Sequence, residues 1–183
     1  DKILKTIDAG KFTILPEQED CHTAIEAILT DRLGDLGKKI HTGRSRNDQV
    51  LTAMRLYVKE EMGICKKLCD EVIVSVGKFS KKYGAIVYPG YTHMRKAMPS
   101  TFLLWSSSFA DSMRDNQILF EAVWKIVDQS PLGTAAGYGV PLELDREFTA
   151  KEMGFARVQE NAVYAQHSRG KFEGALLHYL SQV

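Results

Sequence analysis

A helical period dominates the pattern of apolar positions along the middle of the chain. After Ser45, apolar residues recur at spacings of mostly three, four or seven: Val50, Met54, Tyr57, Val58, Cys65, Leu68, Val72, Val76 and Phe79. This spacing predicts one long helix that begins at Ser45 and ends near 81–84, where two lysines, a tyrosine and a glycine follow one another. Because apolar residues surround much of its surface between Met62 and Val76, we expect this helix to be enclosed on more than one side.

A second run of apolar residues predicts another long helix. Pro99 is well placed to begin it, and its apolar residues recur at helical spacing: Phe102, Trp105, Phe109, Met113, Phe120, Val123, Trp124 and Val127. We interpret the aromatic residues among them as core. Between the two helices, we expect a short apolar stretch and then a compact polar turn at 90–93.

The remaining pattern predicts short helices and a glycine loop. Helices are expected at 3–7, 21–33, 145–153 and from 162 to the end. Residues 132–142, the glycine loop, contain Gly133, Gly137 and Gly139, but neither their spacing nor a preceding strand matches a phosphate-binding fingerprint. Hardly any strand is expected. The fold class is therefore all-α, and helices near 40 and 30 residues, against a mean of roughly 11–12, favour an oligomeric long-helix bundle.

Composition and charge exclude several classes of protein. The chain has 183 residues, 44% of them apolar, and 24 basic against 23 acidic side chains give a formal charge of +1. No global field attracts nucleic acid or an anionic membrane, and no apolar run is long enough to span a membrane. We interpret Cys21, Cys65 and Cys69 as buried thiols and expect a soluble cytoplasmic protein. Because helical patterns already run at Asp1 and still run at Val183, we expect a fragment.

The strongest concentration of polar chemistry is the stretch 38–49, here called the basic loop. Arg44, Ser45, Arg46 and Asn47 crowd a single turn directly ahead of the long helix. The free N–H groups and positive dipole end of a helix start favour an anion such as a carboxylate or phosphate. Two alternatives stay open: Ser45 with Asp48 resembles a capping box, and the two arginines, which have only Asp48 as an adjacent acid, also fit a solvated face.

His93 is a second candidate. It follows Thr92 in the expected turn between the two long helices, where an imidazole can act as acid or base near neutral pH. The alternative is a histidine whose hydrogen bonds are satisfied by the core or by the turn. The remaining histidines have no convincing ligand spacing with cysteines or carboxylates, so no metal site is predicted: these are His22, His41, His167 and His178.

Several of these segments together resemble a known enzyme family. They are similar, in the same order, to segments of the argininosuccinate lyases of the fumarase/aspartase superfamily: EDCHTAIE at 19–26, HTGRSRNDQV at 41–50, PGYTH at 89–93 with Ala97 and Pro99, PLG at 131–133 and DRE at 145–147. The resemblance covers essentially the whole chain, and the HTGRSRNDQV block is highly specific to this branch. Many members have glutamine where this chain has Arg95 and Met98.

The resemblance implies a fold, a reaction and roles for five residues. The fold is a homotetramer with a central bundle of long helices from every subunit; residues 1–41 belong to its N-terminal helical region and 42–183 to the first part of the bundle domain. The reaction is the reversible elimination of arginine from argininosuccinate, which leaves fumarate and needs no cofactor. Ser45, Arg46 and Asn47 contact the succinyl carboxylates, Thr92 hydrogen-bonds substrate, and His93 is part of the acid/base machinery, as proton acceptor or as acid partner.

The resemblance also implies missing parts. In the family, each active site combines segments of three subunits, and a flexible Gly-Ser-Ser loop carries the catalytic serine. That loop would lie after Val183, and an early substrate-binding serine would lie before Asp1. The chain alone is therefore expected to be inactive.

Three other interpretations remain. Another lyase of the superfamily would keep the elimination and change the leaving group. A structural protein like the delta-crystallins, some of which lack activity, would keep only the bundle. A nucleic-acid-binding patch at 38–46 is disfavoured by the near-zero net charge and the lack of interleaved aromatic residues.

Overall fold

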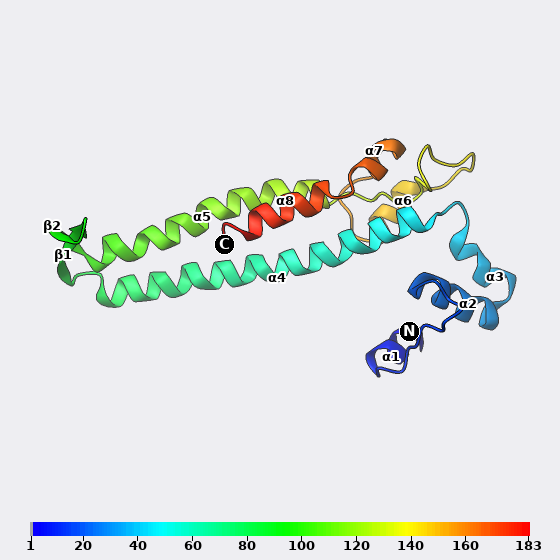
Figure 1. Ribbon diagram of the computed structural model, residues 1–183, viewed down its shortest axis with the longest axis horizontal. Helices are drawn as coiled ribbons and strands as arrows, with labels where there is room; N and C mark the ends of the chain where they lie inside the picture. Colours follow the sequence, from blue (N-terminus) through cyan, green and yellow to red (C-terminus); the bar gives the residue numbers. More distant parts are fainter. Residues whose placement is uncertain (1) are drawn as a thin grey trace.

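The computed structural model describes residues 2–183, and its longest element sets the shape of the molecule (Figure 1). Helix α4 (Arg46–Tyr83, 38 residues) runs along the length of the molecule, and α5 (Phe102–Val127, 26 residues) returns beside it. The bounds predicted for the first long helix are confirmed. At 1.5 Å per residue, α4 is about 57 Å long, so its two ends present separate surfaces.

Short helices gather at the N-terminal end of α4. They are α1 (Lys2–Asp8), α2 (Cys21–Leu33), α3 (Asp35–Lys38) and the 3-10 turn η1 (Lys39–His41). The Asp20 carboxylate caps α2 by accepting the N–H groups of His22 and Thr23. The predicted helix at 21–33 is confirmed.

A β-hairpin joins the two long helices, where the sequence pattern predicts a turn and hardly any strand. Strand β1 (Val87–Thr92) pairs antiparallel with β2 (Arg95–Thr101). The expectation that Pro99 begins the second helix is wrong, because Pro99 lies within β2. The helix begins after Thr101, whose hydroxyl accepts the N–H of Leu104 as an N-cap.

The C-terminal third returns to α4. After α6 (Arg146–Glu152) come α7 (Ala162–His167) and α8 (Lys171–Leu180), so the single helix expected from residue 162 is wrong. The break falls at Gly170, which has a left-handed φ of 77° that a continuing helix does not permit. Helix α8 then lies beside α4 and α5 (Figure 1).

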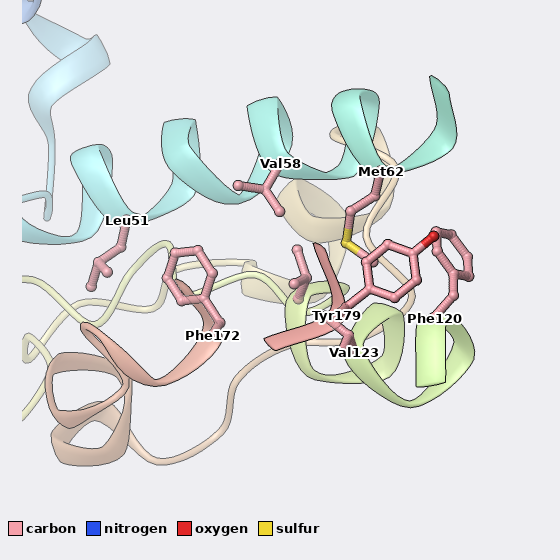
Figure 2. Close-up of a cluster of buried hydrophobic side chains, with 8 residues drawn as sticks. Leu51, Val58, Met62, Phe120, Val123, Phe172 and Tyr179 are labelled. Carbon is pink, nitrogen blue, oxygen red and sulfur yellow. The ribbon is translucent and has the colours of Figure 1, made fainter. Parts of the chain in front are cut away.

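The main hydrophobic core is the contact of these three helices. Figure 2 shows Leu51, Val58 and Met62 of α4 facing Phe172 and Tyr179 of α8. Within this core Arg55 is fully buried; its guanidinium donates to the carbonyls of Ile126 and Val127 at 2.8 and 3.0 Å and to Ser168 at 3.2 Å. Burial lowers the pKa of Arg55 to about 10, so the side chain remains a cation at neutral pH. Arg55 thus ties α4 to the end of α5.

Much of the long-helix surface is apolar and exposed. Half-exposed side chains of α4 and α5 include Ile64, Leu68, Val72, Val74, Trp105 and Phe109. The single chain therefore does not enclose α4, and the enclosure expected in an oligomeric bundle stays a prediction. The core position expected for Trp105 and Phe109 is wrong within this chain. Cys21 is exposed, Cys65 is half-buried and only Cys69 is buried, so the prediction of three buried thiols is also wrong. No helix within residues 2–183 is long and apolar enough to cross a membrane.

Candidate functional site

The start of α4 fixes the polar residues of the basic loop. Ser45 is the N-cap, its hydroxyl accepts the N–H of Asn47 at 3.3 Å, and the Asp48 carboxylate accepts the N–H of Ser45 at 3.0 Å. This reciprocal pair is a capping box. The structural alternative raised for Ser45 and Asp48 is therefore confirmed, and it places Ser45 and Asn47 at the positive end of a long helix dipole.

Arg46 is paired with the start of α2. Its Nη1 lies 2.8 Å from Asp20 Oδ2 and 3.1 Å from Glu19 Oε2, and its Nη2 donates to Thr23 Oγ1 at 2.9 Å. Asp48 is the only acid next to Arg46 in the sequence, but it is not the only acid near it in the fold. Asp20 and Glu19, which lie 26 and 27 positions earlier, pack against the guanidinium within the described residues. Arg46 therefore anchors the basic loop to α2.

The same contacts lower the pKa of the Asp20 carboxylate. Its burial acts to raise the pKa, but the N–H groups of Thr23 and His22 and the charge of Arg46 outweigh that effect and hold the pKa below its usual 3.8. Asp20 is thus a carboxylate at neutral pH. It keeps the Arg46 guanidinium in a fixed orientation.

The next two polar residues face the C-terminal third. Asn47 Oδ1 accepts from Nη2 of Arg169, on the link between α7 and α8, at 3.1 Å. Asp48 is fully buried, and its Oδ2 accepts the N–H groups of Gly133 and Ala135 in the glycine loop at 3.0 and 2.8 Å. The start of α4, the glycine loop and the α7–α8 link therefore form one cluster.

Two hollows border the basic loop, and Arg44 lines both. The larger, of about 230 Å³, lies against α2 and also meets His22, Glu26 and Gln49; the smaller, of about 90 Å³, lies against the glycine loop and Arg146. Among residues 2–183, no ion pair of Arg44 is found. Arg44 is therefore available to pair with an anion that enters either hollow.

Thr92 and His93 lie at the other end of α4. Thr92 ends β1, and His93 and Met94 form the hairpin turn with left-handed φ values of 50° and 60°. All three side chains are exposed. Because α4 is about 57 Å long, one chain brings Ser45, Arg46 and Asn47 together but does not bring Thr92 and His93 to them.

Sequence reasoning missed the partners of the basic loop. Nothing in the sequence connects the acids at 19–20 to Arg46. Likewise, nothing in the sequence near Arg169, Gly133 or Ala135 connects them to Asn47 and Asp48. One sequence signal for these partners was available. An ionised carboxylate has two oxygens that accept hydrogen bonds, so Asp48, which uses one of them in the capping box, could be expected to accept a further donor from elsewhere in the chain. Within the described part of the chain, no group of three or more histidine, cysteine or acidic side chains is placed to hold a metal ion.

Comparisons with solved structures show the fold. The chain superimposes over its full length on 35% of an EDDS lyase crystallised with formate, with a TM-score of 0.81 at 20% identity. Over 87% of its length it superimposes on 40% of a fumarate lyase:delta crystallin from Brucella melitensis, with a TM-score of 0.70 at 20% identity. The predicted all-α long-helix bundle of the fumarase/aspartase type is thereby confirmed.

Comparisons with sequences are more specific. The chain is 56% identical over all 183 residues to an argininosuccinate lyase of Thermotoga neapolitana and 48% identical over 172 residues to one of Xanthomonas campestris, and it spans 46% and 40% of the length of these relatives. These names agree with the resemblance found in the motifs. The profile of a family described as Lyase matches residues 1–173. Since that match covers nearly the whole chain, the chain belongs to this lyase family.

Proposed function

We propose that the protein containing this chain is an argininosuccinate lyase, which converts argininosuccinate reversibly to fumarate and arginine. The observation that carries the proposal is the 56% identity, over the whole chain, to the Thermotoga neapolitana relative of that name. Because the chain spans less than half of that relative, the activity is proposed for the full-length protein, meaning a polypeptide of the relatives' length that contains residues 1–183.

The basic loop has the chemistry that such an elimination needs. Removing a proton next to a carboxylate creates a dianionic intermediate, which fixed donors must stabilise. We assign substrate-carboxylate binding to Ser45, Arg46 and Asn47 at the start of α4. Arg46, already held by Asp20 and Thr23, would meet the substrate in a preset orientation, and this lowers the cost of ordering it on binding.

The hairpin would complete the site from another chain. We assign substrate hydrogen bonding to Thr92 and acid/base chemistry to His93. Since α4 separates these residues from the basic loop by about 57 Å, a shared site requires a second copy packed antiparallel, so that its hairpin meets the loop of the first. The exposed apolar side chains of α4 and α5 supply the surface for such packing, and we propose a homotetramer.

The remaining assignments belong to the same proposal. Residues 1–41 are part of an N-terminal helical region and 42–183 begin the bundle domain. The protein acts in the cytoplasm and uses no cofactor, since proton transfer and charge stabilisation suffice for the elimination.

The proposal is tested by following fumarate through its ultraviolet absorbance. The full-length protein is expected to release fumarate and arginine in equal amounts from argininosuccinate, while the 183-residue chain alone is expected to release none. Release of another amine instead of arginine would favour a different lyase of the family, and a folded full-length protein with no turnover would favour a structural role. Turnover by the chain alone would contradict the assignment of essential groups to other segments.

A further inference from the structure

Asp48 makes more hydrogen bonds than a helix cap requires. One carboxylate oxygen accepts the N–H of Ser45 at 3.0 Å and completes the capping box. The other accepts two further N–H groups, from Gly133 and Ala135, at 3.0 and 2.8 Å. The side chain is fully buried. A buried carboxylate that accepts three backbone N–H groups is held rigidly from both sides.

The glycine loop has a fixed form around this carboxylate. Gly133 and Ala135 adopt left-handed φ values of 89° and 53°, which turn their N–H groups toward Asp48. Thr134 between them is fully buried, and its carbonyl accepts the N–H groups of Gly137 and Gly139. A non-glycine residue with a left-handed backbone conformation is strained, so the conformation of Ala135 depends on the hydrogen bond that its N–H donates to Asp48.

The glycine loop also forms a wall beside the basic loop. The hollow of about 90 Å³ between them is lined by Arg44 on one side and by Gly133 and Arg146 on the other. Gly43 packs closely here, since a Cβ built on it would lie 2.9 Å from Leu144. A displacement of the glycine loop would therefore change the surroundings of Arg44 and of the neighbouring anion-binding residues.

We propose that Asp48 is a positioning residue of the lyase reaction. It holds the glycine loop against the basic loop, so that Ser45, Arg46 and Asn47 meet the substrate carboxylates with fixed geometry. The inference rests on the proposed function, because it assigns Asp48 a part in the same site. A mere capping role makes a different prediction: loss of stability at the start of α4 with unchanged kinetics.

The test compares two variants of the full-length protein. In Asp48→Asn the amide can face either Ser45 or the glycine loop with its oxygen, but its NH₂ group then opposes N–H donors on the other side. Thr52→Val is the matched control, because Thr52 is buried on the next turn and, within residues 2–183, its hydroxyl bonds to the Asp48 carbonyl alone. We expect kcat/KM for argininosuccinate to fall about 100-fold in Asp48→Asn, as for a displacement near 1 Å, and to stay within about 3-fold in Thr52→Val.

A second measurement separates positioning from capping. Amide hydrogen exchange read by mass spectrometry should rise at 132–142 in Asp48→Asn. In Ser45→Ala, which removes the other half of the capping box, it should rise only at the start of α4. A folded Asp48→Asn protein with kcat/KM within 3-fold of wild type, or with unchanged exchange in the glycine loop, would overturn the proposal.

A third variant decides the matter if Asp48→Asn does not fold. Gly133→Ala leaves the capping box intact, but its Cβ would lie 2.9 Å from the Arg146 side chain at a φ that L-residues avoid, so the loop must shift. The kinetic loss should recur there, and wild-type kinetics with a shifted loop would overturn the inference. A wild-type assay run beside these variants distinguishes failure of the proposed function from failure of the positioning role. No turnover by the wild-type protein would contradict the lyase function, whereas the exchange data would still test whether Asp48 holds the glycine loop.

Discussion

The two ends of α4 differ in how far a single chain completes them. At the basic-loop end, Arg46, Asn47 and Asp48 each find a partner from a distant segment, and Asp48 is fully buried. At the hairpin end, Thr92 and His93 project from a turn with exposed side chains. The contacts of the basic-loop end are therefore in place within one chain, whereas Thr92 and His93 at the hairpin end are exposed to solvent. A site that uses both ends must be assembled between chains.

The largest effects are expected on activity. In the full-length protein, Arg46→Ala and His93→Ala should each lower kcat by about 10²- to 10⁴-fold, the range for a lost charge stabiliser or acid/base group. Their stabilities should differ, because Arg46 is held by Asp20 and Thr23, whereas the His93 side chain is exposed. Scanning calorimetry should show a lower Tm for Arg46→Ala and an unchanged Tm for His93→Ala. Equal losses of Tm would contradict the contrast between the ends.

The next effect concerns the core that holds each half of α4 to α5. Arg55→Met removes three charge-assisted hydrogen bonds of a fully buried guanidinium near the basic-loop end and should lower the free energy of unfolding by about 3 kcal/mol. Ser106→Ala removes a buried hydroxyl bonded to Ser80 near the hairpin and should cost about 1 kcal/mol. Denaturant unfolding of both variants measures the difference, and the reverse order would show that the hairpin half is the better anchored.

A smaller effect is expected in the hairpin turn itself. Met94 is 97% exposed and has a left-handed φ of 60°. Met94→Gly should therefore relieve strain and stabilise the hairpin by about 1 kcal/mol. Amide exchange at 87–101 reports this directly, with slower exchange as the expected result. Faster exchange would show that the methionine stabilises the turn.

The smallest effect concerns pH at the basic-loop end. Because the folded pKa of Asp20 lies below 3.8, its ionised form stabilises the fold above that value, and this contribution is lost as the pH falls through the folded pKa. Asp20→Asn keeps an N-cap and removes the charge. Its Tm should lie below that of wild type at neutral pH, with a gap that closes below pH 3.8. A constant gap would assign the effect to capping alone.

The sequence predicted what depends on local pattern. The apolar period and the Ser45 and Asp48 caps located the start of α4 to within a residue and its end within 81–84, and the motifs indicated the family. The hairpin was missed, because the helical period beyond Phe102 made Pro99 look like a helix start, whereas Thr101 supplies the cap.

The partners of the site residues were beyond sequence reasoning. The contacts of Asp48 with Gly133 and of Asn47 with Arg169 join residues 85 and 122 positions apart, and no local pattern records them. The apolar pattern predicted that α4 is covered on more than one side, and the single chain leaves much of that surface exposed. Composition along a helix does not reveal whether the covering surface belongs to the same chain or to another.

The most direct test of the central claim mixes two inactive full-length proteins. Arg46→Ala and His93→Ala, dissociated together and reassembled in equal amounts, should form some sites that take the intact basic loop from one chain and the intact hairpin from the other. With half of the loops and half of the hairpins intact, about one quarter of wild-type activity should return. If both residues of a site came from the same chain, every site would carry one substitution, and the reassembled mixture would stay inactive.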